Sequence, residues 1–230
     1  MPSAGALLAS GRDSDIFEYG PGLVLRRARD GRSLESEGRT MDHVRRHGYP
    51  VPAVQEATEG GTALVMERID GPSMVQQIIR RPWTMGSQAR LLADLHTRLH
   101  AIEAAPWLPP APGPRGRSLL HLDLHPLNVI LSARGPVVID WPNARRGDPA
   151  ADIAMTWVLL DSGAIPAPAP LAAVLARFRS RFVRSFLAAV DVEAARRLVP
   201  TMVADKLRDR NMSEVECAAM RRLARSTTRT

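Results

Sequence analysis

Short apolar runs dominate the first third of the chain and predict β-strands. Runs of this kind occur at 15–19, 22–27, 51–57 and 62–67. Gly20-Pro21 separates the first two runs, and this dipeptide is a turn signal between β-prone segments. Between the two pairs of runs, apolar residues at helical spacing predict a helix over 33–47, with Gly48 as its C-terminal stop. The first third therefore reads as a small α+β unit.

The pattern becomes mainly helical after Gly71. Apolar side chains recur at helical spacing at Leu91, Leu95, Leu99 and Ile102, across 152–160 before Gly163, and across 171–186. Two short strand candidates (128–132 and 136–140) and two proline-rich loops (106–114 and 166–170) lie between these helices. Ser213 and Glu216 have the spacing of a capping box, which predicts the start of a last helix. The pattern as a whole predicts an α+β protein.

Composition and cysteine usage narrow the class of protein. The 230 residues are 45% hydrophobic and 24% charged, which suits a globular chain of one or two domains. The single cysteine, Cys217, excludes an intramolecular disulfide framework and a cysteine-rich zinc site.

Residues 1–15 lack a basic stretch followed by a long apolar one, so we expect no signal peptide. No apolar run reaches the roughly 20 residues of a membrane helix, and we expect a cytoplasmic protein without a membrane partner.

The net charge of +7 and the pI near 10.9 raise the question of nucleic acid. The basic residues are spread along the whole chain, and all of them except Lys206 are arginines. A nucleic-acid-binding protein usually gathers its charge on one element beside aromatic side chains. Aromatic residues make up only 4% of this chain. We therefore expect solvated arginines on helix surfaces and no nucleic-acid partner.

The candidate chemistry lies in two polar segments near the middle of the chain. Phosphoryl transfer from ATP needs a carboxylate near the attacking hydroxyl and oxygen ligands for the Mg²⁺ ions that neutralise the triphosphate. In the spacing His-x-Asp-x-x-x-x-Asn, Asp123 can accept the proton of a substrate hydroxyl, and Asn128 can bind a metal ion. Asp140 ends the following hairpin, where it can face the same metal ions. His121 is expected to brace the loop.

Simpler explanations of these residues fit less well. Two aspartates and an asparagine can meet by chance in a surface hairpin, but Asp140 follows an apolar run, which is unusual for a surface charge. His96 and His100 lie one helical turn apart, like a pair of metal ligands. Their segment lacks the glutamate of a zinc-hydrolase helix, so we expect a packing or capping role for both histidines.

Three motifs resemble those of the aminoglycoside phosphotransferase family: 121–128, 139–141 and 147–152. That family is similar in fold to protein kinases and includes choline and homoserine kinases. The resemblance implies a two-lobed α+β fold, with a small strand-rich lobe over residues 1–68 and a larger, mainly helical lobe over 69–230. It also implies that Asp152 steadies the catalytic loop from a helix start, where a carboxylate is favourable in any case.

The resemblance extends to the N-terminal third. In this family a basic residue on the third strand pairs with a helix glutamate and holds the α- and β-phosphates of ATP. Glu37 occupies the position of that glutamate. The usual lysine is replaced here by Arg26 or Arg27, and both assignments remain open. Arginine keeps the charge but not the point-like geometry of an ammonium, so the resemblance implies altered phosphate positioning.

The chain between the two lobes resembles the family's hinge. The resemblance implies that the backbone of Glu67 and Ile69 binds the adenine of ATP and that Met66 lines the pocket, although Met66 also fits an ordinary core position. A glycine-rich phosphate loop is absent, and residues 11–15 take its place. Their backbone N–H groups and Ser14 are candidates for phosphate contacts.

Together these observations predict an enzyme that uses ATP and Mg²⁺ to phosphorylate a hydroxyl group of an aminoglycoside-like antibiotic or a hydroxylated metabolite. Four carboxylates of the helical part could serve a cationic aminosugar or pair with arginines: Asp161, Asp205, Asp209 and Glu214. The replaced lysine keeps open the alternative of a nucleotide-binding pseudokinase or sensor. A protein kinase is disfavoured, because the chain lacks Asp-Phe-Gly and Ala-Pro-Glu signatures.

Overall fold

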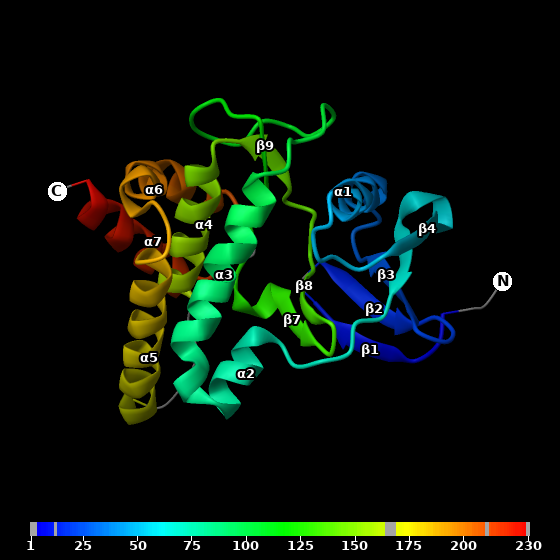
Figure 1. Ribbon diagram of the computed structural model, residues 1–230, viewed down its shortest axis with the longest axis horizontal. Helices are drawn as coiled ribbons and strands as arrows, with labels where there is room; N and C mark the ends of the chain where they lie inside the picture. The colour runs from blue at the N-terminus through cyan, green and yellow to red at the C-terminus, as the bar shows by residue number, and fades with distance from the viewer. Residues whose placement is uncertain (1–3, 12, 164–168, 210–211, 229–230) are drawn as a thin grey trace.

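A computed structural model describes residues 4–11, 13–163, 169–209 and 212–228 and shows two parts (Figure 1). A strand-rich N-terminal part lies at one side of the molecule, and a larger helical part lies at the other. This mixed architecture confirms the predicted α+β fold class.

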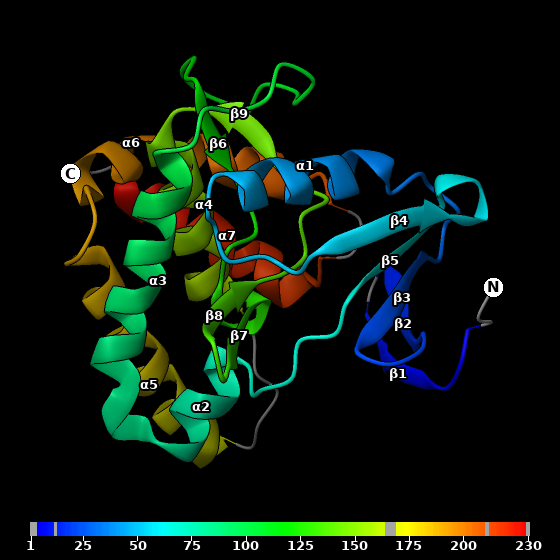
Figure 2. The same ribbon diagram turned by 45° about the vertical axis from the view of Figure 1, so that its right-hand side comes forward.

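The N-terminal part is a five-stranded antiparallel sheet with one helix against it. In sheet order the strands are β1 (Leu7–Ser10), β2 (Ser14–Glu18), β3 (Leu23–Ala28), β5 (Ala63–Glu67) and β4 (Val54–Thr58). Helix α1 (Glu35–Arg46) lies beside β4 (Figure 2). Gly38 lets α1 approach the sheet closely, because a Cβ there would lie 3.1 Å from the Leu64 side chain of β5 and 3.6 Å from that of Val54 in β4. The predicted strands and helix are all present, and β1 is a strand that the hydrophobic pattern did not predict.

The alternation of side chains along β3 sends its two arginines to opposite faces of the sheet. Arg26 pairs with Ile16 on one side and Leu64 on the other, and only 7% of its surface is exposed. Arg27 instead pairs with Glu59, and its guanidinium lies 5.0 Å from the ring centroid of Phe17. Arg26 is therefore the arginine on the face that α1 covers.

The helical part begins with two helices after the sheet. Helix α2 (Met74–Arg80) starts with a capping box formed by Ser73 and Gln76. A short 3₁₀ turn, Pro82–Thr84, leads to α3 (Met85–His100). The predicted apolar stripe lies on α3 except for Ile102, which follows the end of the helix.

Two small β-pairs lie between α3 and the N-terminal sheet. Strand β6 (Ser118–Leu120) pairs with β9 (Arg145–Gly147), and β7 (Val129–Ser132) forms a hairpin with β8 (Gly135–Val138). The hairpin was predicted, whereas β6 and β9 are too short to show a periodic pattern. Strand β8 ends at Val138, before the predicted end at Asp140, because Asp140 has a left-handed φ of 71° that turns the chain out of the strand.

Four helices follow in the described part of the chain: α4 (Pro149–Ser162), α5 (Ala169–Leu187), α6 (Val192–Lys206) and α7 (Glu214–Thr227). The predicted capping box opens α7, but the pattern gave no prediction for α6. The predicted loop at 166–170 falls largely on 164–168, which lie outside the described residues, and α5 begins at Ala169. No helix of the described ranges is long and apolar enough to cross a membrane.

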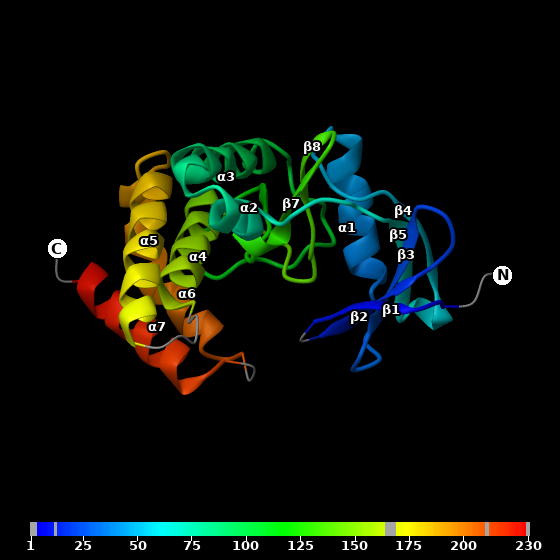
Figure 3. The same cartoon turned by 90° about the horizontal axis from the view of Figure 1, so that it is seen from below.

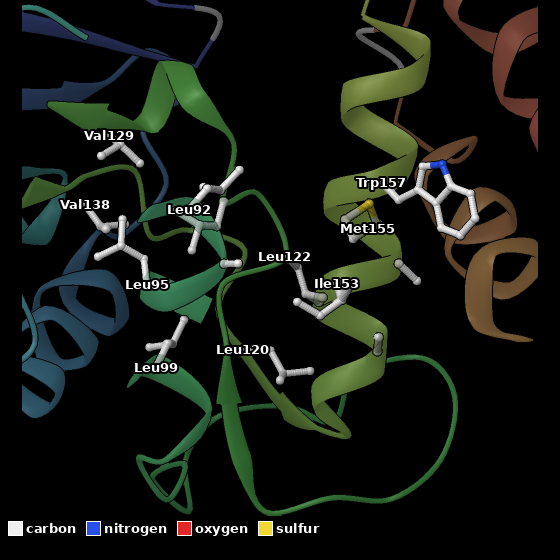
Figure 4. Close-up of a cluster of buried hydrophobic side chains, with 14 of the residues drawn as sticks. Leu92, Leu95, Leu99, Leu120, Leu122, Val129, Val138, Ile153, Met155 and Trp157 are labelled. Carbon is white, nitrogen blue, oxygen red and sulfur yellow. The ribbon is translucent and has the colours of Figure 1, made fainter. Parts of the chain in front are cut away.

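Helix α4 is the centre of the helical part, with α3 on one side and α5, α6 and α7 around the others (Figure 3). Its residues from Ala150 to Val158 are all buried. The leucines of α3 face Ile153 and Met155 of α4, with Leu122 between them (Figure 4). The loop that carries Asp123 therefore runs across a packed core rather than over an open surface.

Candidate functional site

The candidate catalytic residues lie on the loop between β6 and β7. The loop returns to β7 through a short 3₁₀ turn, Pro126–Asn128. Leu122, next to Asp123, has a φ of 57°, and such a left-handed conformation costs roughly 1–3 kcal/mol for a residue other than glycine. Other contacts must hold the backbone in this conformation.

Asp152, in the first turn of α4, provides those contacts. Its Oδ1 accepts a hydrogen bond from the Leu122 N–H at 2.7 Å, and its Oδ2 accepts one from the His121 N–H at 3.1 Å. His100 Nε2 lies 2.9 Å and His96 Nδ1 3.4 Å from the same Oδ2. Burial alone would raise the pKa of Asp152, but the hydrogen bond from His100 and the nearby His96 ring hold that pKa well below its usual range. An ionised carboxylate thus anchors the loop.

Asp123 and Asn128 face each other across the loop. Asn128 Nδ2 donates to the carbonyl oxygen of Asp123 at 2.9 Å and to its Oδ2 at 3.1 Å. These bonds use the amide nitrogen and leave the amide oxygen as a candidate metal ligand. Burial raises the pKa of Asp123 to about 7, against the opposing charge of Lys206. A group with a pKa near the working pH is well matched to proton transfer.

His121 connects the loop to the segment that carries Asp140. Burial lowers the pKa of His121 to about 4, so the ring is neutral at pH 7. Its Nδ1 then accepts a hydrogen bond from the Asp123 N–H at 3.2 Å, and its Nε2–H donates to the Ile139 carbonyl at 3.2 Å. The ring packs against Trp141, with centroids 4.5 Å apart. One neutral side chain therefore ties the two polar segments together.

Arg26 joins the sheet to the helical part. Its Nη1 lies 3.0 Å from Glu37 Oε1, and its Nη2 donates to Asp140 Oδ1 at 2.7 Å. Burial would lower the pKa of Arg26, but the charges of Glu37 and Asp140 outweigh it and raise that pKa. Burial would also raise the pKa of Asp140, yet the Arg26 guanidinium keeps it lowered. Of the two candidate arginines, Arg26 is the one that meets Glu37.

The residues present fit a site for Mg²⁺ and a nucleotide. Asp140 and Asn128 supply carboxylate and amide oxygens, which are the ligands that Mg²⁺ prefers. Among the described residues, three buried side-chain atoms of the predicted nucleotide site lack a hydrogen-bond partner: Ser14 Oγ, Arg26 Nε and Glu37 Oε2. Buried polar groups are nearly always paired. Phosphate oxygens would satisfy the two donors among these atoms.

The sequence profile of the Phosphotransferase enzyme family matches this chain over residues 5–112 and 76–190. Together the two matched segments span more than half of the chain. The chain belongs to this family.

Solved structures of phosphotransferases share the fold of this chain. The ternary complex of a thermostable mutant of aminoglycoside phosphotransferase APH(4)-Ia with AMP-PNP and hygromycin B has a TM-score of 0.68 at 16% identity, covering 97% of this chain and 92% of that chain. The streptomycin–ATP complex of APH(2")-IIa has a TM-score of 0.60 at 16% identity, with the same two coverages. A choline/ethanolamine kinase family protein from Mesorhizobium loti has a TM-score of 0.56 at 14% identity, covering 98% and 89%.

At identities this low, the structural likeness shows only the fold of this member of the phosphotransferase family. That fold is the two-lobed, protein-kinase-like fold that the sequence motifs implied. No curated protein matches the chain in sequence.

The predicted adenine-binding segment of this phosphotransferase lies at the end of β5. Met66 is buried in the core, where it pairs with Val24 across the sheet. The Glu67 N–H already donates to the Ala53 carbonyl at 2.8 Å, which leaves only the Glu67 carbonyl for adenine. The Ile69 N–H donates to none of the described residues. One backbone acceptor and one backbone donor therefore suit an adenine edge.

The predicted phosphate loop, residues 11–15, is described only in part, because Arg12 lies outside the described residues. Ser14 begins β2 and is 7% exposed. Its position beside Ala28 of β3 places it on the strand next to the one that carries Arg26.

Sequence reasoning gave no role to Lys206, whose charge acts on two side chains of the catalytic loop. Its Nζ lies 3.1 Å from Asp209 Oδ2. Burial lowers the pKa of His125 to about 4, and the charge of Lys206 lowers it further, as it also lowers the pKa of Asp123. The signal in the sequence was that Lys206 is the one lysine among 31 basic residues.

The carboxylates considered for an aminosugar are mostly engaged within the protein. Asp209 pairs with Lys206, and Asp205 Oδ1 lies 4.0 Å from Arg208 Nη1. Burial raises the pKa of Asp161, against the charges of Arg179 and Arg222. Glu214 is the first residue of α7, where a carboxylate is favourable in any helix.

Proposed function

We propose that this chain transfers the γ-phosphoryl group of Mg·ATP to a hydroxyl group of a small molecule. The observation that carries the proposal is Asp123, a largely buried carboxyl group with a pKa of about 7 on a loop anchored by Asp152. Asn128 fixes its orientation through the bond to Oδ2. A protein that only bound nucleotides would have no need of a positioned base.

In the proposed reaction Asp123 orients the acceptor hydroxyl and accepts its proton as the oxygen attacks the γ-phosphorus. The new oxygen–phosphorus bond forms as the bond to the β-phosphate oxygen breaks, and ADP leaves. Asn128 and Asp140 would hold Mg²⁺, which neutralises charge on the phosphates when it is bound. His121 and Asp152 keep the loop in place. The residues thus act mainly by positioning and by charge.

The nucleotide would lie between residues 1–68 and 69–230, which we propose as the two lobes. Arg26, held by Glu37, would contact the α- and β-phosphates. The Glu67 carbonyl and the Ile69 N–H would bind adenine, with Met66 behind it, and Ser14 is a further candidate for a phosphate contact. Similar structures named above hold ATP or AMP-PNP, which supports this nucleotide.

The proposed acceptor is an aminoglycoside-like antibiotic or a hydroxylated metabolite. Aminoglycoside phosphotransferases in complex with hygromycin B or streptomycin share the fold, which supports the first class. A choline/ethanolamine kinase family protein shares it too, which supports a small metabolite equally well. ADP release with acceptors of both kinds distinguishes these classes.

One observation favours a second candidate, a nucleotide sensor without transferase activity. Arg26 stands where the family usually has a lysine, and it is bonded to Asp140, a proposed metal ligand. A protein in which Mg·ATP could not separate this pair would bind the nucleotide in a form that does not react. Binding without turnover would identify such a sensor.

The test is ADP release from Mg·ATP across a panel of aminoglycosides, other hydroxylated antibiotics, choline and amino alcohols. Asp123→Asn removes the base, and Asp94→Asn, at an exposed position on α3, is the matched control. We expect turnover with at least one acceptor in the wild type and Asp94→Asn, and its loss in Asp123→Asn. If no acceptor reacts and calorimetry detects no binding of Mg·ATP, the proposal is wrong.

A further inference from the structure

Two histidines on α3 and one aspartate on α4 bring three potential metal ligands together. His96 and His100 are four residues apart, so they lie on the same face of α3. Asp152 contacts both of them from the first turn of α4. One ligand atom from each of the three residues lies within 4.8 Å of the other two, and no other such group occurs in the part of the chain that the structure describes. The sequence showed the histidine pair but not the carboxylate beside it.

The hydrogen bonds around His96 decide which of its ring nitrogens carries hydrogen. Thr156 Oγ1 donates its one hydrogen to the Leu124 carbonyl at 2.8 Å, so toward His96 Nε2, 3.1 Å away, it can only accept. The hydrogen of the neutral ring is therefore on Nε2. Burial lowers the pKa of His96, against the opposing effect of Asp152, so the ring is neutral at pH 7. Nδ1 then carries a lone pair.

The lone pair of His96 Nδ1 meets a second acceptor. The nitrogen lies 3.4 Å from Asp152 Oδ2, in a site where these two side chains are 1% and 0% exposed. Nδ1 is buried and forms no hydrogen bond with any of the described residues. Buried polar atoms are nearly always paired, and two acceptors cannot pair with each other. A cation between them would pair both.

The spacing of these atoms fits a tetrahedral metal ion. Zn²⁺ binds histidine nitrogen and carboxylate oxygen at about 2.0–2.2 Å, which holds ligand atoms about 3.4 Å apart. His96 Nδ1 lies at that distance from Asp152 Oδ2, whereas His100 Nε2 lies at 2.9 Å and would move outward slightly. The N–H groups of Leu122 and His121 donate to Asp152 at 2.7 and 3.1 Å. The ion would replace only the histidine contacts of Oδ2 and leave these backbone bonds intact.

We propose that His96, His100 and Asp152 form a Zn²⁺ site that fixes the catalytic loop to α3 and α4. Imidazole nitrogen suits Zn²⁺ and Mg²⁺ prefers oxygen, so this site is separate from the Mg²⁺ that Asn128 and Asp140 would hold. A water molecule would take the fourth position on the side of His100, whose side chain is the most exposed of the three at 10%. The proposal concerns metal binding and does not depend on phosphoryl transfer.

Calorimetry with ZnCl₂ tests the site in the full chain, purified without a histidine tag and kept in excess Mg²⁺ to fill sites made of oxygen ligands. We expect the wild type to bind one Zn²⁺ ion. His100→Gln should weaken binding by about 100-fold, because the loss of even a residue that only supports a ligand costs about 10–100-fold. His100 is chosen because it is the least buried ligand, so its replacement disturbs the core least.

The matched control is the other pair of histidines four residues apart. His43 and His47 lie on or next to α1 with ring centroids 4.7 Å apart, but within the described ranges no third ligand completes a group with them. We therefore expect His43→Gln to leave Zn²⁺ binding unchanged.

Nitrogen-15 NMR of the histidine rings identifies the ligand atoms in the wild type, without a substitution in the site. We expect Zn²⁺ to shift the signals of His96 Nδ1 and His100 Nε2 and to leave those of His43 and His47 unchanged. A wild type that binds no Zn²⁺ in excess Mg²⁺, or a His100→Gln variant that binds it as tightly, would overturn the site. Binding that His43→Gln abolishes would place the ion on α1 and overturn the proposal as well.

Discussion

Arg26 of β3 donates a hydrogen bond to Asp140 at 2.7 Å, from Nη2 to Oδ1, although 114 residues separate them in the chain. The same guanidinium lies 3.0 Å from Glu37 of α1. One positive charge therefore serves a carboxylate from each lobe. The pair also joins the proposed phosphate-binding residue to a proposed metal ligand, so in the proposed reaction Mg·ATP would separate the two side chains.

Arg26→Met is expected to destabilise the protein by about 3 kcal/mol, because it leaves Glu37 buried without a counter-charge. Arg27→Met is the matched control from the neighbouring position. The Arg27–Glu59 pair is 38% exposed on both sides, and exposed pairs contribute less than about 1 kcal/mol. Urea unfolding of both variants measures the difference. Equal losses of stability would show that the buried Arg26–Glu37 pair contributes no more to stability than the exposed Arg27–Glu59 pair.

Arg26→Lys is expected to lower the Mg²⁺ concentration needed for half-maximal ADP formation. A lysine ammonium keeps one charge for Glu37 but lacks the planar fork that reaches Glu37 and Asp140 at once. Asp140 would then be released to the metal ion. A Mg²⁺ titration at fixed ATP measures the effect, and we expect a several-fold decrease. A higher Mg²⁺ requirement would show that Arg26 assists the metal site rather than competing with it.

Much of this architecture could be predicted from the sequence, because its signals are local. The stripe of α3 and the capping box of α7 depend on residues within one or two helical turns, and the spacing from His121 to Asn128 is contained in one loop. The Arg26–Asp140 bond could not be predicted in this way. It depends on how the sheet sits against the helical part, which no local pattern encodes.

Other features escaped prediction for similar reasons. Strands β6 and β9 have three residues each, which is too short for a period of two to be visible. Helix α6 carries Pro200 in its interior, a residue that normally argues against a helix. Since α6 was not predicted, the effect of the Lys206 charge on the pKa of Asp123 could not be predicted either.

Asp152→Asn is expected to lower both stability and activity. An amide has one acceptor oxygen where the carboxylate has two, so a backbone N–H of Leu122 or His121 loses its partner in a fully buried site. We expect a loss of about 3 kcal/mol and, because the loop shifts, a decrease in kcat on the order of 100-fold. Urea unfolding and steady-state kinetics check both values.

Asp148→Asn is the matched control in the same motif. Asp148 caps α4 by accepting from the Ala150 N–H at 2.8 Å, and asparagine caps helices about as well as aspartate. We expect a stability change within about 0.5 kcal/mol and normal kcat. If the two substitutions had equal effects, the anchor role of Asp152 would be wrong.

Asp123→Asn is expected to stabilise the metal-free protein at pH 8. The pKa of Asp123 is raised from 3.8 to about 7 by burial, so the folded state favours the protonated form. The stability that protonation contributes is complete below pH 4 and is lost as the pH rises through 7. The variant should therefore exceed the wild type by on the order of 2–4 kcal/mol at pH 8, and this excess should shrink toward pH 4. A difference that does not depend on pH would contradict the raised pKa.

The most direct test of the account is the product itself, because ADP release alone does not separate transfer from hydrolysis of ATP. Phosphorus NMR of a reaction with Mg·ATP and the acceptor found by the panel shows where the γ-phosphoryl group goes. We expect a phosphate-ester signal in the wild type and in Asp94→Asn, and none in Asp123→Asn. Inorganic phosphate as the only product, or an ester formed equally fast by Asp123→Asn, would contradict the proposed phosphotransferase.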